Sequence, residues 1–434
     1  MSATFATTRD CPYCGSKILL ADSPIVATNF PSSEFREDME LEDVALPSGS
    51  QPLRLLAKTR WPVVAPSPNE QRADQPEPSR KLAVVEAAFG ALRGPTADAL
   101  PPLLSDGVHM EDVPSRACSV CEFPLPPDID ERPAVVVAIV GVNRVGKTHL
   151  LAASLTEAYA RRGLAALGCT EFVPSEVCST RFMVDYNHPL FRRNEVLEAT
   201  QAESAARFEP LVFNVTFEGI SPFSLVVHDV AGEVLGDYRK RAEAATYLRA
   251  ARGIIFVIDP RDIDLLRDGL PDWILDNNET GFDQGALLAS CLKPDAVASE
   301  TPVPVALVVS KADLLPLASG EQDLSFLVPA QPATETSEEF VARINDFSRS
   351  VRSFLERYGA YNILGPAKAY VEHAAAKRAE MTPDKQNTVG NLTFHAVSAL
   401  GSPPDENDEL RTRVRPVNCV DPLGAVLAQI VRKW

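Results

Sequence analysis

The fold of this chain is decided by the stretch Ala134-Val-Val-Val-Ala-Ile-Val-Gly-Val-Asn-Arg-Val-Gly-Lys-Thr-His-Leu-Leu151. An unbroken apolar run, typical of a strand buried on both faces of a parallel sheet, leads into Gly141. The pattern G-x4-G-K-T follows over residues 141–148, and apolar residues at helical spacing come next. Strand, glycine-rich loop and helix in this order predict a phosphate-binding loop.

The residues of this loop have separate predicted tasks. Glycines let consecutive backbone N–H groups point at phosphate oxygens, and the helix N-terminus adds the positive end of its dipole. We expect Lys147 to reach the β- and γ-phosphates and the Thr148 hydroxyl to bind Mg²⁺. The predicted nucleotide contacts from this stretch are Gly141, Asn143, Arg144, Val145, Gly146, Lys147, Thr148 and His149.

Length and composition bound the classes of function. The 434 residues are 45% apolar, enough for a sizeable core. A net charge of −17 argues against a nucleic-acid-binding surface and against binding to an anionic membrane. The sequence has no N-terminal apolar segment and no apolar run of membrane-spanning length, so we expect a cytoplasmic protein. Its eight cysteines then need a role other than disulfides.

Two C-x2-C turns, Cys11-Pro-Tyr-Cys14 and Cys118-Ser-Val-Cys121, predict a structural Zn²⁺ site with four thiolates. About 100 residues lie between the turns, against the usual 15–20 or so, and they are rich in proline and acidic residues. We therefore expect a split zinc ribbon over residues 1–21 and 115–130, with a largely disordered insertion at 22–114.

The alternative for the first turn is a redox-active pair, because C-P-Y-C resembles a thioredoxin-type turn. No βαβ pattern surrounds it, which favours zinc. We expect the ribbon to be a separate unit. Replacing Cys14 and Cys118 together would then remove the metal and leave nucleotide binding nearly unchanged.

After a polar linker, the alternation of strands and helices over residues 131–434 predicts one nucleotide-binding α/β domain. Its insertions are expected at about 260–302 and 314–391, and amphipathic helices at 337–363 and 422–434. Apolar and polar residues alternate over the segment 211–218, which predicts a strand near the sheet edge with one face exposed to solvent. Further strands are expected at 223–228, 253–259, 303–310 and 392–397.

The ends of these strands carry further motifs. Asp229 and Gly232, of an Asp-x-x-Gly motif, follow one strand; the carboxylate would hold Mg²⁺ and the Gly232 N–H a γ-phosphate oxygen. Asp313, of Ser310-Lys311-Ala-Asp313, can accept from both guanine N1–H and N2–H₂, and adenine offers no such pair of donors. In Ser398-Ala399-Leu400 the Ala399 N–H would reach guanine O6. This set points to GTP and GDP as ligands.

These motifs, in this order, resemble those of P-loop GTPases of the translation-factor-related, Ras-like class. Asp-Val-Ala-Gly-Glu, the strand ending Phe-Val-Ile-Asp-Pro260 and the preceding cysteine turns resemble more specifically the prokaryotic double-GTPase family. The resemblance implies a Ras-like, mostly parallel sheet with one antiparallel edge strand and helices on both faces. It also implies Mg²⁺, GTP and a switch role, in a prokaryotic signalling or conflict system, with slow hydrolysis in the absence of a protein partner or activating protein.

The chain departs from the family at four positions. Ser310 stands where Asn or Thr is usual, which removes a side-chain amide that would brace the loop. Asn143 and Arg144 occupy positions that are small glycines in many relatives, and Arg144 lies either close to the phosphates or in solvent. Glu233 stands where Ras-like proteins have a water-positioning Gln; its carboxylate would either act as a base or slow hydrolysis by like-charge repulsion.

The predicted catalytic set is Lys147, Thr200, Gly232 and Glu233, with Thr200 as the Mg²⁺ ligand from the first switch segment. Thr180 and Thr170 are the alternatives for that threonine. Two rival functions stay open: a nucleotide-binding scaffold that does not hydrolyse, and an ATPase.

Overall fold

The computed structural model describes most of the second half of the chain and parts of the first. The described residues are 8–13, 15–20, 25–31, 110–116, 118–120, 125–126, 128–161, 163–197, 210–229, 248–275, 283–293, 296, 302–321, 324–327, 335–381, 392–405, 410 and 412–431. For residues 25–31, 110–116, 176–177 and 229 the description covers the backbone only.

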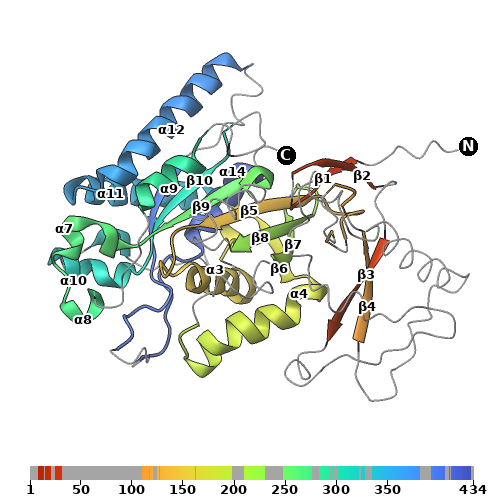
Figure 1. The fold of residues 1–434 in the computed structure, drawn as a ribbon, viewed down its shortest axis with the longest axis horizontal. Helices are drawn as coiled ribbons and strands as arrows, with labels where there is room; N and C mark the ends of the chain where they lie inside the picture. The colour runs from red at the N-terminus through yellow and green to blue at the C-terminus, as the bar shows by residue number, and fades with distance from the viewer. Residues whose placement is uncertain are drawn as a thin grey trace, which may run out of the picture.

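A seven-stranded sheet organises the large domain, in the order β11-β10-β9-β5-β8-β7-β6 (Figure 1). All neighbouring strands from β11 to β8 are parallel, and the β8/β7 and β7/β6 pairs are antiparallel. The predicted mixed α/β fold with a mostly parallel sheet is confirmed. The strands are β5 (Ala134–Val140), β6 (Cys169–Pro174), β7 (Leu211–Phe217), β8 (Phe223–Asp229), β9 (Gly253–Ile258), β10 (Val305–Val309) and β11 (Leu392–Ala396).

The prediction that the antiparallel strand forms the edge of the sheet is wrong. The antiparallel strand β7 is second from the edge, and β6 is the edge strand. The Thr216 hydroxyl donates to the Glu171 carboxylate across the pair (2.8 Å), and Phe172 lies 4.9 Å from Phe213, ring centre to ring centre. The β6 sequence Cys-Thr-Glu-Phe-Val-Pro has no clear alternation, so its period did not reveal a strand. Because β6 and β8 both pair with β7, both hydrogen-bonding edges of β7 are occupied.

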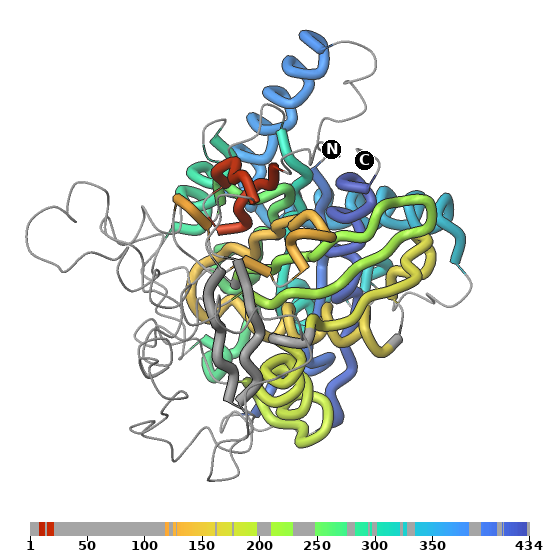
Figure 2. The backbone as a smooth tube through the Cα atoms, turned by 90° about the vertical axis from the view of Figure 1, so that its right-hand side faces the viewer, coloured from red at the N-terminus to blue at the C-terminus, as the bar shows by residue number. Residues whose placement is uncertain are grey.

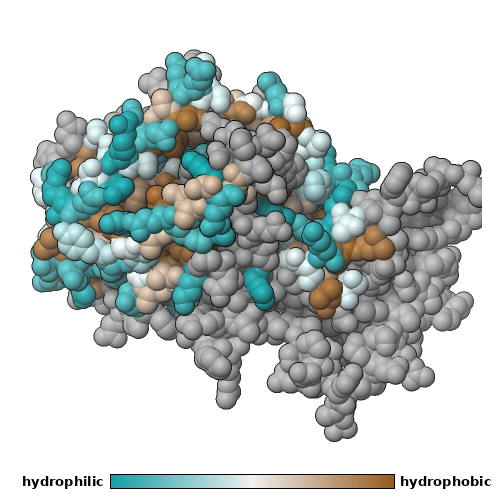
Figure 3. Space-filling model, turned by 90° about the horizontal axis from the view of Figure 1, so that it is seen from above, coloured by the Kyte–Doolittle hydropathy of each residue, from teal (hydrophilic) through white to brown (hydrophobic). Residues whose placement is uncertain are grey.

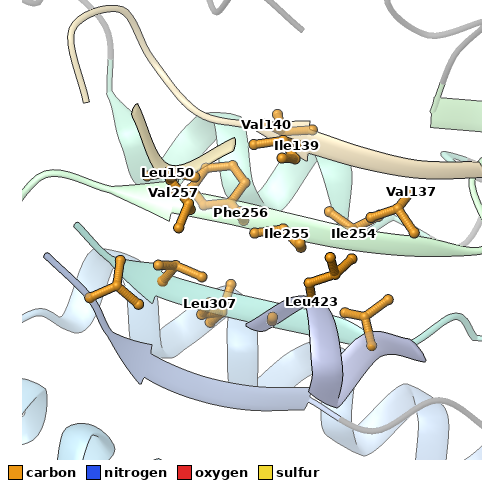
Figure 4. Packing of buried hydrophobic residues seen from close by; sticks show 14 of the residues in the cluster. Val137, Ile139, Val140, Leu150, Ile254, Ile255, Phe256, Val257, Leu307 and Leu423 are labelled. Atoms are coloured by element: carbon orange, nitrogen blue, oxygen red, sulfur yellow. The ribbon is translucent and has the colours of Figure 1, made fainter. Parts of the chain in front are cut away.

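The core lies on both sides of the central strands (Figure 4). Every residue of β9 and almost every residue of β5 is buried, as the apolar runs predict. Leu150 from α3 (Lys147–Arg161) and Leu423 from α14 (Asp421–Val431) pack against the strand side chains. Each such side chain contributes about 1.5–3 kcal/mol by leaving water. The sheet that carries the P-loop is therefore rigid.

The first predicted insertion, after β9, consists of short helices: a 3-10 turn (Pro260–Asp262), α7 (Asp264–Arg267), α8 (Asp272–Leu275) and α9 (Gln284–Cys291). The second follows β10 and contains 3-10 turns (Ala312–Leu314, Ser325–Leu327), α10 (Leu315–Ser319), α11 (Ser337–Arg357) and α12 (Tyr361–Glu380). Between α3 and β7 lie a 3-10 turn (Ala165–Leu167), β6, α4 (Glu176–Arg181) and a π-helix (Phe182–Arg193).

The helix expected at 337–363 is two helices. A capping box of Thr336 and Glu339 starts α11, which ends at Arg357, and Gly359 turns the chain with a φ of 70°. Helix α12 then runs to Glu380 and projects from the body of the domain (Figure 1). Its Gly365 and Pro366 are signals of a helix end, which is why the sequence did not predict it.

Two small antiparallel sheets precede this domain: β1 (Thr8–Asp10) with β2 (Lys17–Leu19), and β3 (Ile25–Pro31) with β4 (Met110–Arg116). Residues 25–31 and 110–114 thus belong to strands although they fall in the predicted 22–114 insertion, and residues 115–116 of β4 fall in the predicted ribbon segment 115–130. The stretch between these two strands, 32–109, lies outside the described residues. Figure 2 shows the red segment around residues 8–20 beside the orange chain that begins near residue 118.

The surface mixes polar residues with small, scattered apolar patches (Figure 3). None of the helices in the described part of the chain has the length and apolarity needed to cross a bilayer.

Candidate functional site

The predicted P-loop connects β5 to α3, as the motif requires. Gly141 lies so close to β9 that a Cβ atom there would be 2.6 Å from the Val257 carbonyl oxygen. Gly146 has a φ of 86°, which a side chain rarely adopts. Each glycine of the motif is therefore required, for a different reason.

The Lys147 ammonium lies within the loop and is only 7% exposed. Its Nζ donates to the carbonyl oxygens of Gly141 (3.0 Å) and Val142 (2.7 Å). Because the helix begins at Lys147, the charge lies at the positive end of the α3 dipole. Two positive features meet there, which is an arrangement suited to an anion.

The Ser310-Lys311-Ala-Asp313 segment is attached to the P-loop at two points. The Ser310 hydroxyl lies 2.6 Å from the Val145 carbonyl oxygen and 3.0 Å from that of Ile258. The Lys311 Nζ donates to the Arg144 carbonyl (2.6 Å). The expectation that Ser310 leaves the loop without a brace is therefore wrong, because the Ser310 hydroxyl bonds to the Val145 carbonyl oxygen of the P-loop.

Asp313 is brought to the third predicted motif, Ser398-Ala399-Leu400. The Ala312 N–H donates to the Val397 carbonyl (2.9 Å), and the Ser398 hydroxyl bonds to the Asp313 carboxylate. Burial raises the pKa of Asp313, and the hydrogen bond from Ser398 opposes this shift. The Gly401 N–H donates to the same Ser398 hydroxyl oxygen (2.7 Å), which fixes its direction. Loops after β5, β10 and β11 thus meet at one end of the sheet.

Asp259, directly after β9, is a residue to which the sequence assigned no task. It is fully buried, and its carboxylate binds Lys311 Nζ (2.7 Å) and the Arg261 guanidinium (Nη2 at 2.7 Å). Burial alone would raise the pKa of Asp259, but Lys311 and Arg261 lower it to about 2. Asp259 therefore holds Lys311 against the P-loop. An acidic residue ending an otherwise apolar strand, followed by Pro260-Arg261, is the sequence signal that could have revealed it.

Arg144 has a φ of 58°, in the left-handed region that costs a residue with a side chain roughly 1–2 kcal/mol. Its side chain is exposed. We expect Arg144→Gly to raise the free energy of unfolding by about 1 kcal/mol in a urea titration. Asn143→Gly is the matched control, because Asn143 has no positive φ; it should not stabilise the protein, and an equal gain would contradict the explanation.

His149 connects α3 to the segment that precedes β7. Its Nε2 accepts a hydrogen bond from the Leu197 N–H (3.0 Å). Burial and the nearby Lys311 charge lower the pKa of His149 to about 4, so the ring is neutral at pH 7 and this nitrogen stays an acceptor.

The predicted magnesium ligands are only partly described. Thr148 is the second residue of α3, and the Asp229 backbone pairs with Ile139 of β5, next to the P-loop. Thr200, Gly232 and Glu233 lie outside the described residues. Of the alternatives, Thr180 lies on α4, and Thr170 lies on the outermost strand, where its hydroxyl donates to the Thr216 carbonyl (3.3 Å). Thr170 is therefore far along the sheet from β5.

Each cysteine turn carries a backbone N–H that points at sulfur. The Tyr13 N–H donates to Cys11 Sγ (3.4 Å), and the Val120 N–H to Cys118 Sγ (3.3 Å). Such donors stabilise a thiolate, and both sulfur atoms belong to one buried cluster with Ile18, Leu125 and Ile129. Cys14 and Cys121 lie outside the described residues, among which no group of three metal-binding side chains occurs. The described halves of the turns fit a thiolate metal site.

The expectation that the ribbon is a separate unit is wrong for the first turn. Tyr13 is buried against His228 of β8, with ring centres 5.9 Å apart and an angle of 82° between the rings. A ring nitrogen of His228 bonds to the Pro12 carbonyl, and burial lowers the pKa of His228 to about 4. The first cysteine turn is part of the surface of the domain that is built on the seven-stranded sheet.

Comparisons with known proteins find chains similar to this one, among them a curated protein and a solved structure. SaeC of Mycolicibacterium smegmatis, to which a role in ESX-1 scaffolding and assembly is ascribed, is 26% identical over 352 residues, which are 76% of this chain and 84% of that protein. No protein-family model matches. The small GTPase Arl6 (BBS3) of Trypanosoma brucei, solved with GppNp, covers 62% of this chain and 88% of its own at 12% identity and a TM-score of 0.24. At this TM-score the likeness carries no argument, so the proposed function rests on this chain's own strand order and loop contacts.

Proposed function

We propose that this chain is a GTP-binding switch of the Ras-like P-loop class, with slow Mg²⁺-dependent GTP hydrolysis. The observation that carries the proposal is the meeting of three loops. Ser310 and Lys311 bind the P-loop carbonyls of Val145 and Arg144, and Asp313 bonds to Ser398. These contacts support the proposal, because they hold the Asp313 carboxylate at a fixed distance from the loop that would bind phosphate, as recognition of a whole nucleotide requires.

The residues of this site then have definite tasks. Lys147 exchanges its two loop carbonyls for phosphate oxygens, and Asp313 accepts two hydrogen bonds from guanine. Thr148, Asp229 and Thr200 would hold Mg²⁺, which neutralises charge on the β- and γ-phosphates when it is bound. The Gly232 N–H would bond a γ-phosphate oxygen. Lys311 lies along Gly146, with its Cε 3.9 Å from where a Cβ would stand, and so covers the loop.

Slow hydrolysis follows from Glu233 in the place of a Gln. A carboxylate repels the γ-phosphate, and it accepts from water without donating to the phosphate. We expect a protein partner or activating protein to supply what is missing. The cysteine turns and the strand ending in Asp259 support the finer assignment to the double-GTPase family, with one structural Zn²⁺ per chain and a role in prokaryotic signalling or conflict, in the cytoplasm.

A second candidate is a nucleotide-binding scaffold that does not hydrolyse GTP. The likeness to SaeC favours it, since the role ascribed to that protein is scaffolding and assembly. In this case the nucleotide would stabilise the shape that a partner protein recognises.

Single-turnover hydrolysis separates these candidates. Purified protein in excess over γ-labelled GTP should release phosphate slowly with Mg²⁺, and Glu233→Ala should release it faster, because the carboxylate that repels the γ-phosphate is gone. Thr148→Ala is the reference for lost Mg²⁺ binding and should release none. If wild-type protein binds GTP and releases no more phosphate than Thr148→Ala, the scaffold is the better description.

A further inference from the structure

The two cysteine turns have the same design but opposite surroundings. Tyr13 and Val120 hold the same position in their turns, two residues after Cys11 and Cys118. Tyr13 is 2% exposed, whereas Val120 is 60% exposed. A metal needs neither side chain as a ligand, so the burial of Tyr13 has another cause: the first turn is docked on the nucleotide-binding domain.

The docked turn contacts β8 and the segment that leads into β9, two strands that lie on either side of β5 in the large sheet. On β8, Tyr13 and Pro12 contact His228, the residue before Asp229. On the approach to β9, Gly15 lies against the backbone of Ala250, where an added Cβ would come within 3.4 Å, and Asp10 forms an ion pair with Arg252. The Arg252 N–H in turn donates to the Val136 carbonyl of β5 (2.8 Å), the strand that leads into the P-loop.

The contacts on His228 are buried and directional, whereas the Asp10–Arg252 ion pair is exposed. His228 is 3% exposed, and its ring is held on one side by the edge of Tyr13 and by the Pro12 carbonyl. An aromatic edge-to-face pair adds about 0.5–1.5 kcal/mol beyond the area it buries. A turn that is ordered by bound metal holds these contacts in one geometry, whereas a turn without metal loses the constraint on its cysteines.

We propose that the first cysteine turn is a positioning element for the nucleotide site, through which zinc binding and GTP·Mg²⁺ binding are coupled. Zinc at Cys11 would fix Pro12 and Tyr13 on His228, and His228 would fix the end of β8, where Asp229 is the predicted Mg²⁺ ligand. This inference rests on the proposed function. Coupling is reciprocal, so zinc should raise GTP·Mg²⁺ affinity by the same factor by which GTP·Mg²⁺ raises zinc affinity. Because Asp229 acts on the metal and not on the base, GDP without Mg²⁺ should be little affected.

The test uses the full chain, purified without chelator and expected to hold about one zinc per chain by elemental analysis. The affinity for a fluorescent GTP analogue is titrated at several Mg²⁺ concentrations, before and after removal of zinc with a chelator that leaves Mg²⁺ in solution. We expect removal to weaken GTP·Mg²⁺ binding roughly fivefold or more, the low end of common coupling, and to raise the Mg²⁺ concentration required. Unchanged GTP·Mg²⁺ affinity after complete zinc removal would overturn the proposal.

Side-chain variants test which residues carry the coupling between zinc binding and GTP·Mg²⁺ binding. Tyr13→Ala should reproduce the effect of zinc removal on Mg²⁺ dependence while zinc content stays the same, and Tyr13→Phe should restore it because the ring remains. Val120→Ala is the matched control and should behave as wild type. If Tyr13→Ala fails to fold, the chelator titration on wild-type protein still decides. Equal effects of Tyr13→Ala and Val120→Ala would also overturn the proposal. Protein that binds no GTP under any condition would instead refute the proposed function.

Discussion

Lys147→Ala is expected to abolish GTP binding at concentrations at which the wild-type protein is saturated. The ammonium is buried within the P-loop and already binds two backbone carbonyls, at 3.0 Å and 2.7 Å, so it is held ready for phosphate oxygens. Removing one partner of a buried, hydrogen-bonded charge pair costs about 2–5 kcal/mol, or roughly 30-fold to several thousand-fold in affinity. Titration calorimetry with GTP and Mg²⁺ measures the loss.

Two further variants make this result specific. Lys147→Arg keeps the positive charge, but its planar guanidinium does not fit between the Gly141 and Val142 carbonyls, so binding should still be weakened. Lys368→Ala removes an exposed lysine of α12 and should bind as wild type. Normal GTP binding by Lys147→Ala would refute the P-loop assignment.

Asp259→Ala is expected to lower the free energy of unfolding by about 3–5 kcal/mol. Breaking a buried ion pair leaves an uncompensated charge, and here both Lys311 and Arg261 lose their common partner. A urea titration measures the change. Asp268→Ala removes an exposed carboxylate from the end of α7 and should stay within about 0.5 kcal/mol of wild type. A similarly small effect of Asp259→Ala would mean that the ion pairs of Asp259 with Lys311 and Arg261 add nothing to the free energy of unfolding.

The pKa of Asp259 gives this prediction a pH dependence. The folded-state pKa of about 2 lies below the ordinary value of 3.8. A carboxylate of this kind contributes stability above pH 3.8 and loses it as the pH falls toward 2. The contribution is on the order of 2 kcal/mol. Wild-type protein should lose this part of its stability over that window, and Asp259→Ala should show a flatter pH profile there.

Long apolar runs predicted the framework of the molecule, because a strand buried on both faces can hardly tolerate polar residues. The P-loop, the strand that ends at Asp229, the strand that precedes Asp313, and the helix near the C-terminus lie where the sequence predicts them. Local patterns of this kind depend on a few neighbouring residues, so they survive without knowledge of the tertiary structure.

What the sequence did not reveal depends on contacts between distant segments. The β6 strand is defined by its pairing with β7, and α12 forms despite Gly365 and Pro366 because it packs on α9. The task of Asp259 depends on Lys311, which comes from another loop. The docking of Tyr13 on His228 joins the N-terminal turn to β8, and no local sequence pattern predicts this contact.

Competition between GTP and ATP tests the central claim most directly. Asp313 should accept two hydrogen bonds from guanine, and adenine leaves this acceptor without them, which costs about 1.5–3 kcal/mol because the acceptor is charged. Displacement of a fluorescent GTP analogue by GTP and by ATP should therefore show a preference for GTP of roughly tenfold to more than a hundredfold. Asp313→Asn should weaken GTP and favour xanthosine triphosphate, whose ring N–H and exocyclic oxygen complement an amide. Equal displacement by GTP and ATP, unchanged in Asp313→Asn, would contradict the account.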